Sequence, residues 1–235
     1  MAPPRAAASP THPAATTKPE EERYTDDPHW TEGNIVLLAG DTRFRVPDYL
    51  LYWSSPFLMR TCHGQKKIKL ELDASTLRLF LILATTLRVD FTLPVPALAS
   101  LFRLLTAWEC KTLGALAIER IDAALRGNLV HPLKLLHLGL AADCEALRVM
   151  ALCFTAPGNV GEPLYHTPQR GGAWDAFSPD NWPFALWETL NAFPAGVWAL
   201  AKATSVSFMP GEALAEFFER LYAEAQGIHV PAATC

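Results

Sequence analysis

The residue types best suited to chemistry in this chain are two histidines and two cysteines in its second half, His131, His137, Cys144 and Cys153. Imidazole and thiolate groups bind zinc, and a Cys–His pair can form a nucleophilic centre. Their spacing matches no familiar zinc pattern, and no cysteine lies in a glycine-rich or electropositive loop that would lower the pKa of its thiol. We therefore expect no metal site and no catalytic cysteine.

The short motifs of common enzymes are also missing from the sequence. It contains no GxGxxG or GxxxxGK[ST] for phosphate binding, no HExxH for zinc hydrolysis and no GxSxG for a serine nucleophile. A protein without enzymatic activity and without a cofactor is the main expectation. An enzyme or a metal-binding protein is the least favoured alternative.

Aromatic and basic residues offer a second kind of chemistry, the binding of nucleic acid. Tryptophans at 174, 182, 187 and 198 could stack on bases, but no basic residues surround them, so core packing is the better expectation. The only basic run, at 66–69, fits a solvated strand edge. With a formal net charge of -4, the chain is not expected to bind nucleic acid.

Tyr49, Tyr52 and Trp53 form the most unusual group in the sequence. They occur at positions i, i+3 and i+4 of a short helix predicted at 47–54, on the face opposite its apolar residues. Three large aromatic side chains left in water would form a patch that monomers rarely expose. Either a partner protein covers this face, or the amphipathic helix predicted at 211–227 of the same chain does.

The first half of the chain must position this helix. Pro, Ala, Ser and Thr dominate a predicted disordered tail at 1–28. Two strands then flank Gly40 and Asp41, a pair that favours a two-residue hairpin turn. Helices at 47–54 and 55–62, an alternating strand at 67–72 and an enclosed helix at 74–87, with Asp73 as its N-cap, follow.

From about residue 95 onward the sequence predicts helices and loops. Segment 104–117 matches 138–151 at an offset of 34, which predicts two stacked helical hairpins. A Gly- and Pro-rich stretch at 156–181 should form a long irregular connection, and 229–235 a short tail.

Three stretches in this order, "GNIVLLAGDTRFRVPDYLLYWSSPFLMR", "KIKLELDASTLRLFLILATT" and "LFRLLTAWECKTLGALAIERI", resemble the BTB/POZ domain, in the divergent form of mushroom-type fungi. The resemblance implies an α+β fold, a small sheet with a helical cluster at 29–126, followed by an all-α extension at 127–228. Asn34 and Pro47 stand where the family has an Asp and a His. This altered polar pair removes a titratable group, and any pocket function that depends on the Asp/His pair is in doubt.

The resemblance also implies a function. The helix at 47–54 commonly contributes to BTB dimer interfaces, so Tyr49, Tyr52 and Trp53 become candidates for pairing with a second copy or with another BTB protein. Many BTB proteins are adaptors that bring substrates to cullin-type ubiquitin ligases, and others regulate transcription. We expect an intracellular protein, cytoplasmic or nuclear, since no apolar run approaches the roughly 20 residues that span a bilayer.

A different class of protein is a helical-repeat scaffold in which the strand-like N-terminal part is incidental. An isolated two-stranded hairpin is marginal in water. The two interpretations therefore differ in one structural expectation: in a BTB-type fold the hairpin and the strand at 67–72 belong to one sheet.

Overall fold

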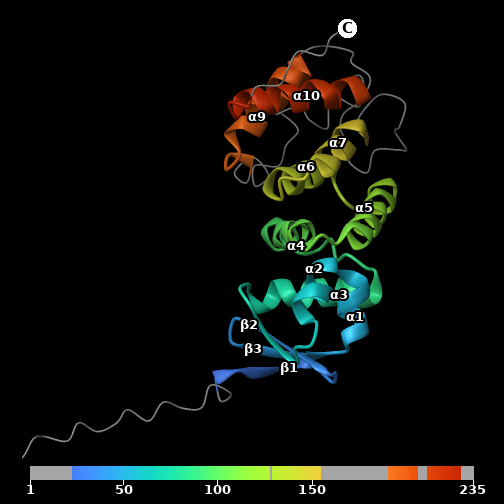
Figure 1. The fold of residues 1–235 in the computed structure, drawn as a ribbon. Coiled ribbons are helices and arrows are strands. Elements are labelled where there is room, and N and C mark those ends of the chain that lie inside the picture. The colour runs from blue at the N-terminus through green and yellow to red at the C-terminus, as the bar shows by residue number, and fades with distance from the viewer. Residues whose placement is uncertain (1–22, 128, 155–189, 206–210, 229–235) are drawn as a thin grey trace, which may run out of the picture.

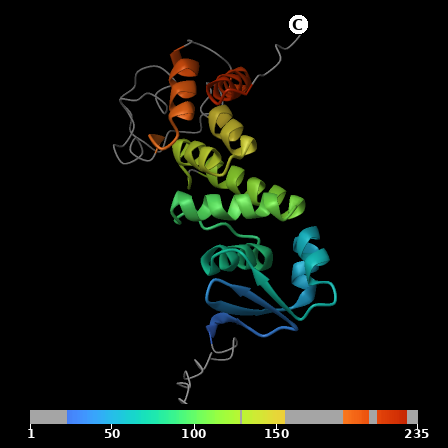
Figure 2. The same ribbon diagram turned by 60° about the vertical axis from the view of Figure 1, so that its left-hand side comes forward.

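The computed structural model describes residues 23–127, 129–154, 190–205 and 211–228. A four-stranded sheet lies at one end, and the helices stack away from it in successive layers, with α10 at the far end (Figure 1). A second view shows the same layers (Figure 2). The fold is therefore α+β, with the strands early in the chain and the helices after them.

The sheet has the strand order β1-β3-β2-β4. Its strands are β1 (Thr25–Thr31), β2 (Ile35–Ala39), β3 (Thr42–Val46) and β4 (Lys67–Leu70). β2 and β3 are antiparallel and are joined through Gly40, whose φ of 57° suits a glycine in a two-residue hairpin turn. β4 pairs in parallel with β2, so the hairpin and the 67–70 strand share one sheet.

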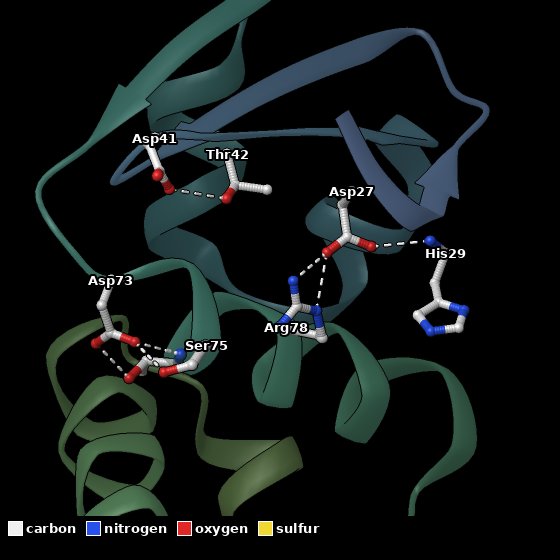
Figure 3. A network of polar contacts seen from close by, with 8 residues as sticks. Asp27, His29, Asp41, Thr42, Asp73, Ser75 and Arg78 are labelled. Carbon is white, nitrogen blue, oxygen red and sulfur yellow. Dashed lines mark hydrogen bonds and ion pairs between the residues drawn. The ribbon is translucent and has the colours of Figure 1, made fainter. Parts of the chain in front are cut away.

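The predicted tail at 1–28 is too long, because residues 25–28 belong to β1, which pairs in parallel with β3. Pro28 is acceptable there since β1 is an edge strand. The strand is fixed from inside by Asp27, which is fully buried and accepts hydrogen bonds from Arg78 Nε at 2.8 Å and from the His29 amide at 2.9 Å (Figure 3). Residues 1–22 of that tail lie outside the described residues.

Helices α1 (Asp48–Ser54), α2 (Pro56–Cys62) and α3 (Ala74–Thr86) cover one face of the sheet (Figure 1). Asp73 caps α3 as predicted, because its carboxylate accepts from the Thr76 amide at 2.7 Å. The expectation that α3 is enclosed on most sides is only partly met. Ile82, Thr85 and Thr86 face solvent near its C-terminal end.

The predicted repeat forms two helical hairpins, α4 (Val95–Ala107) with α5 (Lys111–Arg126), and α6 (Pro132–Ala141) with α7 (Glu145–Phe154). Both turns have the same backbone. Glu109 and Asp143, 34 positions apart, have φ values of 56° and 52°. In each turn the following cysteine amide donates at 2.8 Å to a carbonyl five residues earlier, Leu105 or Gly139. The two hairpins stack on one another through α4 and α6.

The last helices are α9 (Pro194–Ser205) and α10 (Gly211–Ala225). α10 packs against α7 and α9, and its predicted apolar face buries Leu214, Phe218 and Tyr222. The apolar core runs without interruption from the sheet to α10. The predicted irregular connection at 156–181 and the C-terminal tail at 229–235 lie outside the described residues.

Among the described helices, none combines the length and the apolar character that a membrane crossing requires.

Candidate interaction surface

Helix α1 begins where the two residues of the altered polar pair meet. Pro47 occupies the N-cap position and offers no side-chain hydrogen bond to the helix. Asn34 supplies it instead: its Oδ1 accepts from the Asp48 amide at 2.8 Å. Gly33 makes this approach possible, because a Cβ at that position would lie 2.2 Å from the Val46 carbonyl carbon. The pair therefore serves as a neutral helix cap.

The two faces of α1 differ sharply. Leu50, Leu51 and Ser54 are buried against the core. On the opposite face Tyr49, Tyr52 and Trp53 are exposed by 68%, 37% and 44% of their surface. The three sequence-predicted site residues therefore lie together on one outward face, which we call the α1 aromatic face.

A buried hydroxyl holds this face in place. Ser55, between α1 and α2, donates to the Trp108 carbonyl at 2.7 Å and accepts from the Leu58 amide at 3.1 Å. Trp108, in the α4–α5 turn, stacks on Phe57 and meets Phe80 edge-on at a centroid distance of 5.0 Å. The joint between α1 and α2 is thus attached to two further elements, so the aromatic face stands on a packed base.

Beside this face lies a hollow of about 360 Å³ between α1 and the start of α5. It is lined by the residues Tyr52, Trp53, Ser54, Pro56, Glu109, Lys111 and Thr112. Glu109, on its rim, forms an exposed ion pair with Arg60 at 2.9 Å. The site thus combines aromatic rings, hydroxyls and charges of both signs, a composition that suits a protein surface better than a reacting group.

The helix expected to compete for this face packs elsewhere. Glu219 of α10 forms a bidentate ion pair with Arg148 of α7, with both N–O distances at 2.7 Å, and the Arg148 guanidinium lies 4.9 Å from the centroid of the Tyr222 ring. These contacts hold α10 at the end of the molecule opposite α1 (Figure 1). The α1 aromatic face is therefore not covered by α10.

The histidines and cysteines do not form a common site in the described part of the chain. His131 caps α6, its Nδ1 accepting from the Leu133 amide at 3.0 Å, and His137 packs edge-on against Phe193. Burial lowers the pKa of both imidazoles. Nowhere in the described ranges do three His, Cys, Asp or Glu side chains gather closely enough to hold a metal ion.

The buried thiols are poor nucleophiles. Burial raises the pKa of Cys62 to about 11 and also raises the pKa of Cys110. Because the thiolate is the reactive species, this shift works against attack on a substrate at neutral pH.

Two further expectations have different outcomes. Lys66, Lys67 and Lys69 are exposed on and beside β4, as a solvated strand edge requires. Trp198 on α9 is 39% exposed, so the expectation that it packs in the core is wrong. The other three tryptophans of that expectation, at 174, 182 and 187, lie outside the described residues.

Comparison of the chain with protein-family models, with curated proteins and with solved structures gives no match. What can be stated of its class is the architecture itself, a small mixed sheet covered by helices and extended by stacked helical hairpins.

Proposed function

We propose that this chain is a non-enzymatic protein–protein interaction module of the BTB/POZ type, which self-associates through the α1 aromatic face. The observation that carries the proposal is the exposure of Tyr49, Tyr52 and Trp53 on a helix whose other side is fixed in the core. Aromatic residues are enriched at protein interfaces and dominate their energetics. A second copy of the chain offers the same face, as a two-fold interface requires.

The sheet supports the BTB part of the proposal. A hairpin, two short helices and a strand returning to the same sheet follow one another in the order that the resemblance implies. In a helical-repeat scaffold with an incidental N-terminal part, the hairpin would stand alone. Instead, β4 extends it and α3 packs beneath it, so this alternative loses its main structural premise.

An adaptor role is an extension of this proposal. A dimer through α1, or a pair with another BTB protein, leaves the helical extension free for a different protein, such as a cullin-type scaffold or a transcription-related factor. A hollow of about 660 Å³ between α7 and α10 lies on that extension, far from the α1 aromatic face.

The test is the solution mass of the full chain, measured by light scattering after size exclusion over a range of concentrations. We expect a dimer that dissociates on dilution, and a monomer for Trp53→Ser. The matched control is Trp198→Ser, since Trp198 is exposed to a similar degree but lies on α9. This control variant should remain a dimer.

Thermal unfolding of both variants separates loss of association from loss of folding. A wild-type chain that is monomeric at every concentration would overturn the proposal. So would equal weakening of the dimer by the two tryptophan substitutions, because the association would then not depend on the α1 aromatic face.

A further inference from the structure

The face of the sheet away from the helices carries a regular array of basic side chains. The register places Val36 of β2 between Arg45 of β3 and Lys67 of β4. One step along, Leu38 lies between Arg43 and Lys69 in the same way. Residues that pair across strands point to the same side of a sheet. Two cross-strand rows, each with a cation at both ends, therefore lie side by side.

The opposite side of the strands fixes which face this is. Leu37, Phe44 and Ile68 point into the apolar core beneath α3. Their neighbours in the alternation, Arg43, Arg45, Lys67 and Lys69, must therefore point away from it, and both lysines are exposed. Figures 1 and 2 show the described helices on one face of the sheet only. We call the outward set of four cations the basic sheet face.

The basic sheet face has the dimensions of a strand. Cations two residues apart on one strand are separated by about 6.6 to 6.8 Å, and the β3 and β4 cations lie about 10 Å apart across β2. Every second side chain of any extended peptide repeats at the same 6.6 to 6.8 Å. A peptide laid along the strands can thus present a carboxylate to each cation in turn.

One acidic side chain already follows this rule within the sheet. Asp26 of β1 pairs with Arg43 in the register, and its carboxylate receives two hydrogen bonds from that guanidinium, the Nη2 bond measuring 2.8 Å. This pair, together with the proximity of Arg45, lowers the pKa of Asp26. Glu71 continues the alternation beyond the end of β4. The remaining balance on the four central positions is positive, although the chain as a whole has a formal charge of -4.

We propose that the basic sheet face binds an extended acidic segment of a partner protein, with Asp or Glu at alternate positions. This inference is independent of self-association through α1. Val36 and Leu38 run between the two rows and offer apolar contact to small side chains of the bound segment. The face carries no aromatic residue on which a nucleic-acid base could stack, which favours a peptide over a single-stranded nucleic acid.

The chain has one acidic run of its own that could compete for this face, Glu20, Glu21 and Glu22, shortly before β1 in the sequence. The experiment therefore has to distinguish a partner's segment from this run.

The test uses the full chain and a fluorescein-labelled octapeptide of alternating glutamate and threonine, followed by fluorescence anisotropy at low salt. We expect binding that weakens about tenfold in Lys67→Glu/Lys69→Glu and weakens further as salt rises. The matched control is Arg88→Glu/Arg126→Glu, which changes the net charge equally but lies on other elements. It should bind as the wild type does.

Three further measurements decide the nature of the occupant. Tighter binding to an oligothymidylate, or to phosphatidylserine vesicles, than to the peptide would overturn the proposal in favour of a phosphate ligand. A threefold or greater gain in peptide affinity in Glu20→Gln/Glu21→Gln/Glu22→Gln would overturn it in favour of the chain's own segment. Equal losses in the two charge-reversal variants would show binding by net charge alone, which also overturns it.

Discussion

The two helical hairpins share one backbone design but differ in what they hold. In the first, the turn residue Glu109 pairs with Arg60 of α2, and both side chains are more than half exposed. In the second, the turn residue Asp143 is 3.4 Å from Arg148, and Arg148 continues to Glu219 of α10 with only 6% of its side chain exposed. One turn thus carries a surface ion pair and the other a buried network.

A glycine explains much of this difference. A Cβ at Gly139 in α6 would lie 2.6 Å from the Cγ of Arg148, so the arginine stem crosses α6 where no side chain stands. The equivalent position in the first hairpin is Leu105, and the position equivalent to Arg148 is Gly114, whose Cβ would meet nothing within 4 Å. Small and large residues have changed places between the hairpins, and only the second has a route for a buried cation.

The largest effect expected from this comparison is on Arg148. Replacing Arg148 with methionine keeps much of the volume but leaves Glu219, 19% exposed, without its partner. Loss of one member of a buried pair costs about 3 to 5 kcal/mol. Urea denaturation should show this loss in the free energy of unfolding. If Arg148→Met unfolds within about 1 kcal/mol of the wild type, the network is no stronger than a surface pair.

The glycine swap gives the next test. Gly139→Ala places a methyl group against the Arg148 stem and should destabilise the fold by about 1 to 3 kcal/mol. Gly114→Ala meets open space within α5 and should stabilise it by roughly 0.5 to 1 kcal/mol. Thermal unfolding of the two variants side by side measures both signs. Shifts of the same sign would remove the explanation given for the difference between the hairpins.

A third ion pair, at the sheet, extends the comparison to pH. Burial by itself would raise the pKa of Asp27, but hydrogen bonds from the His29 amide and from Arg78 outweigh it, and the pKa lies below the ordinary value. A lowered pKa contributes stability above the unfolded value of about 3.9, and this contribution disappears as the pH falls through the folded value.

Asp27→Asn should therefore be less stable than the wild type at pH 7, and the gap should narrow below about pH 4. Urea midpoints at pH 7, 4.5 and 3 measure it. A gap that stays constant over this range would mean that the charge of Asp27 contributes nothing beyond its hydrogen bonds.

The smallest expected effect belongs to the first hairpin. Arg60→Met breaks only the exposed pair with Glu109, so the free energy of unfolding should change by less than about 1 kcal/mol. The same urea experiment as for Arg148→Met makes the two values directly comparable. A cost above about 2 kcal/mol would show that the two turns are not different in kind.

What the sequence predicts well here is local. The hairpin turn at Gly40 and Asp41, the Asp73 cap and the 34-residue offset between the helical hairpins all follow from neighbouring residues, and the structure has each of them. The errors concern distant partners. Asp27 looks like part of a polar tail until it meets Arg78, 51 positions away, and α10 finds α7 through a pair separated by 71 positions.

The candidate site shows the same limit. The spacing of Tyr49, Tyr52 and Trp53 predicts that they share one face, and they do. Whether α10 covers that face depends on Arg148 and Glu219, which have no local signature. The role of Asn34 as a cap depends on an amide 14 positions later, and its signal in the sequence is only the Gly33–Asn34 pair beside a proline-initiated helix.

The layered arrangement separates the α1 aromatic face from α10 by the full length of the helical stack (Figure 2). Two chains joined through α1 would each direct α10 away from the joint. Such a particle is bivalent: a ligand engaged by one extension raises the effective concentration of a linked second ligand at the other, provided that its linker spans both arms. Avidity would then depend on linker length, with short linkers binding only one arm.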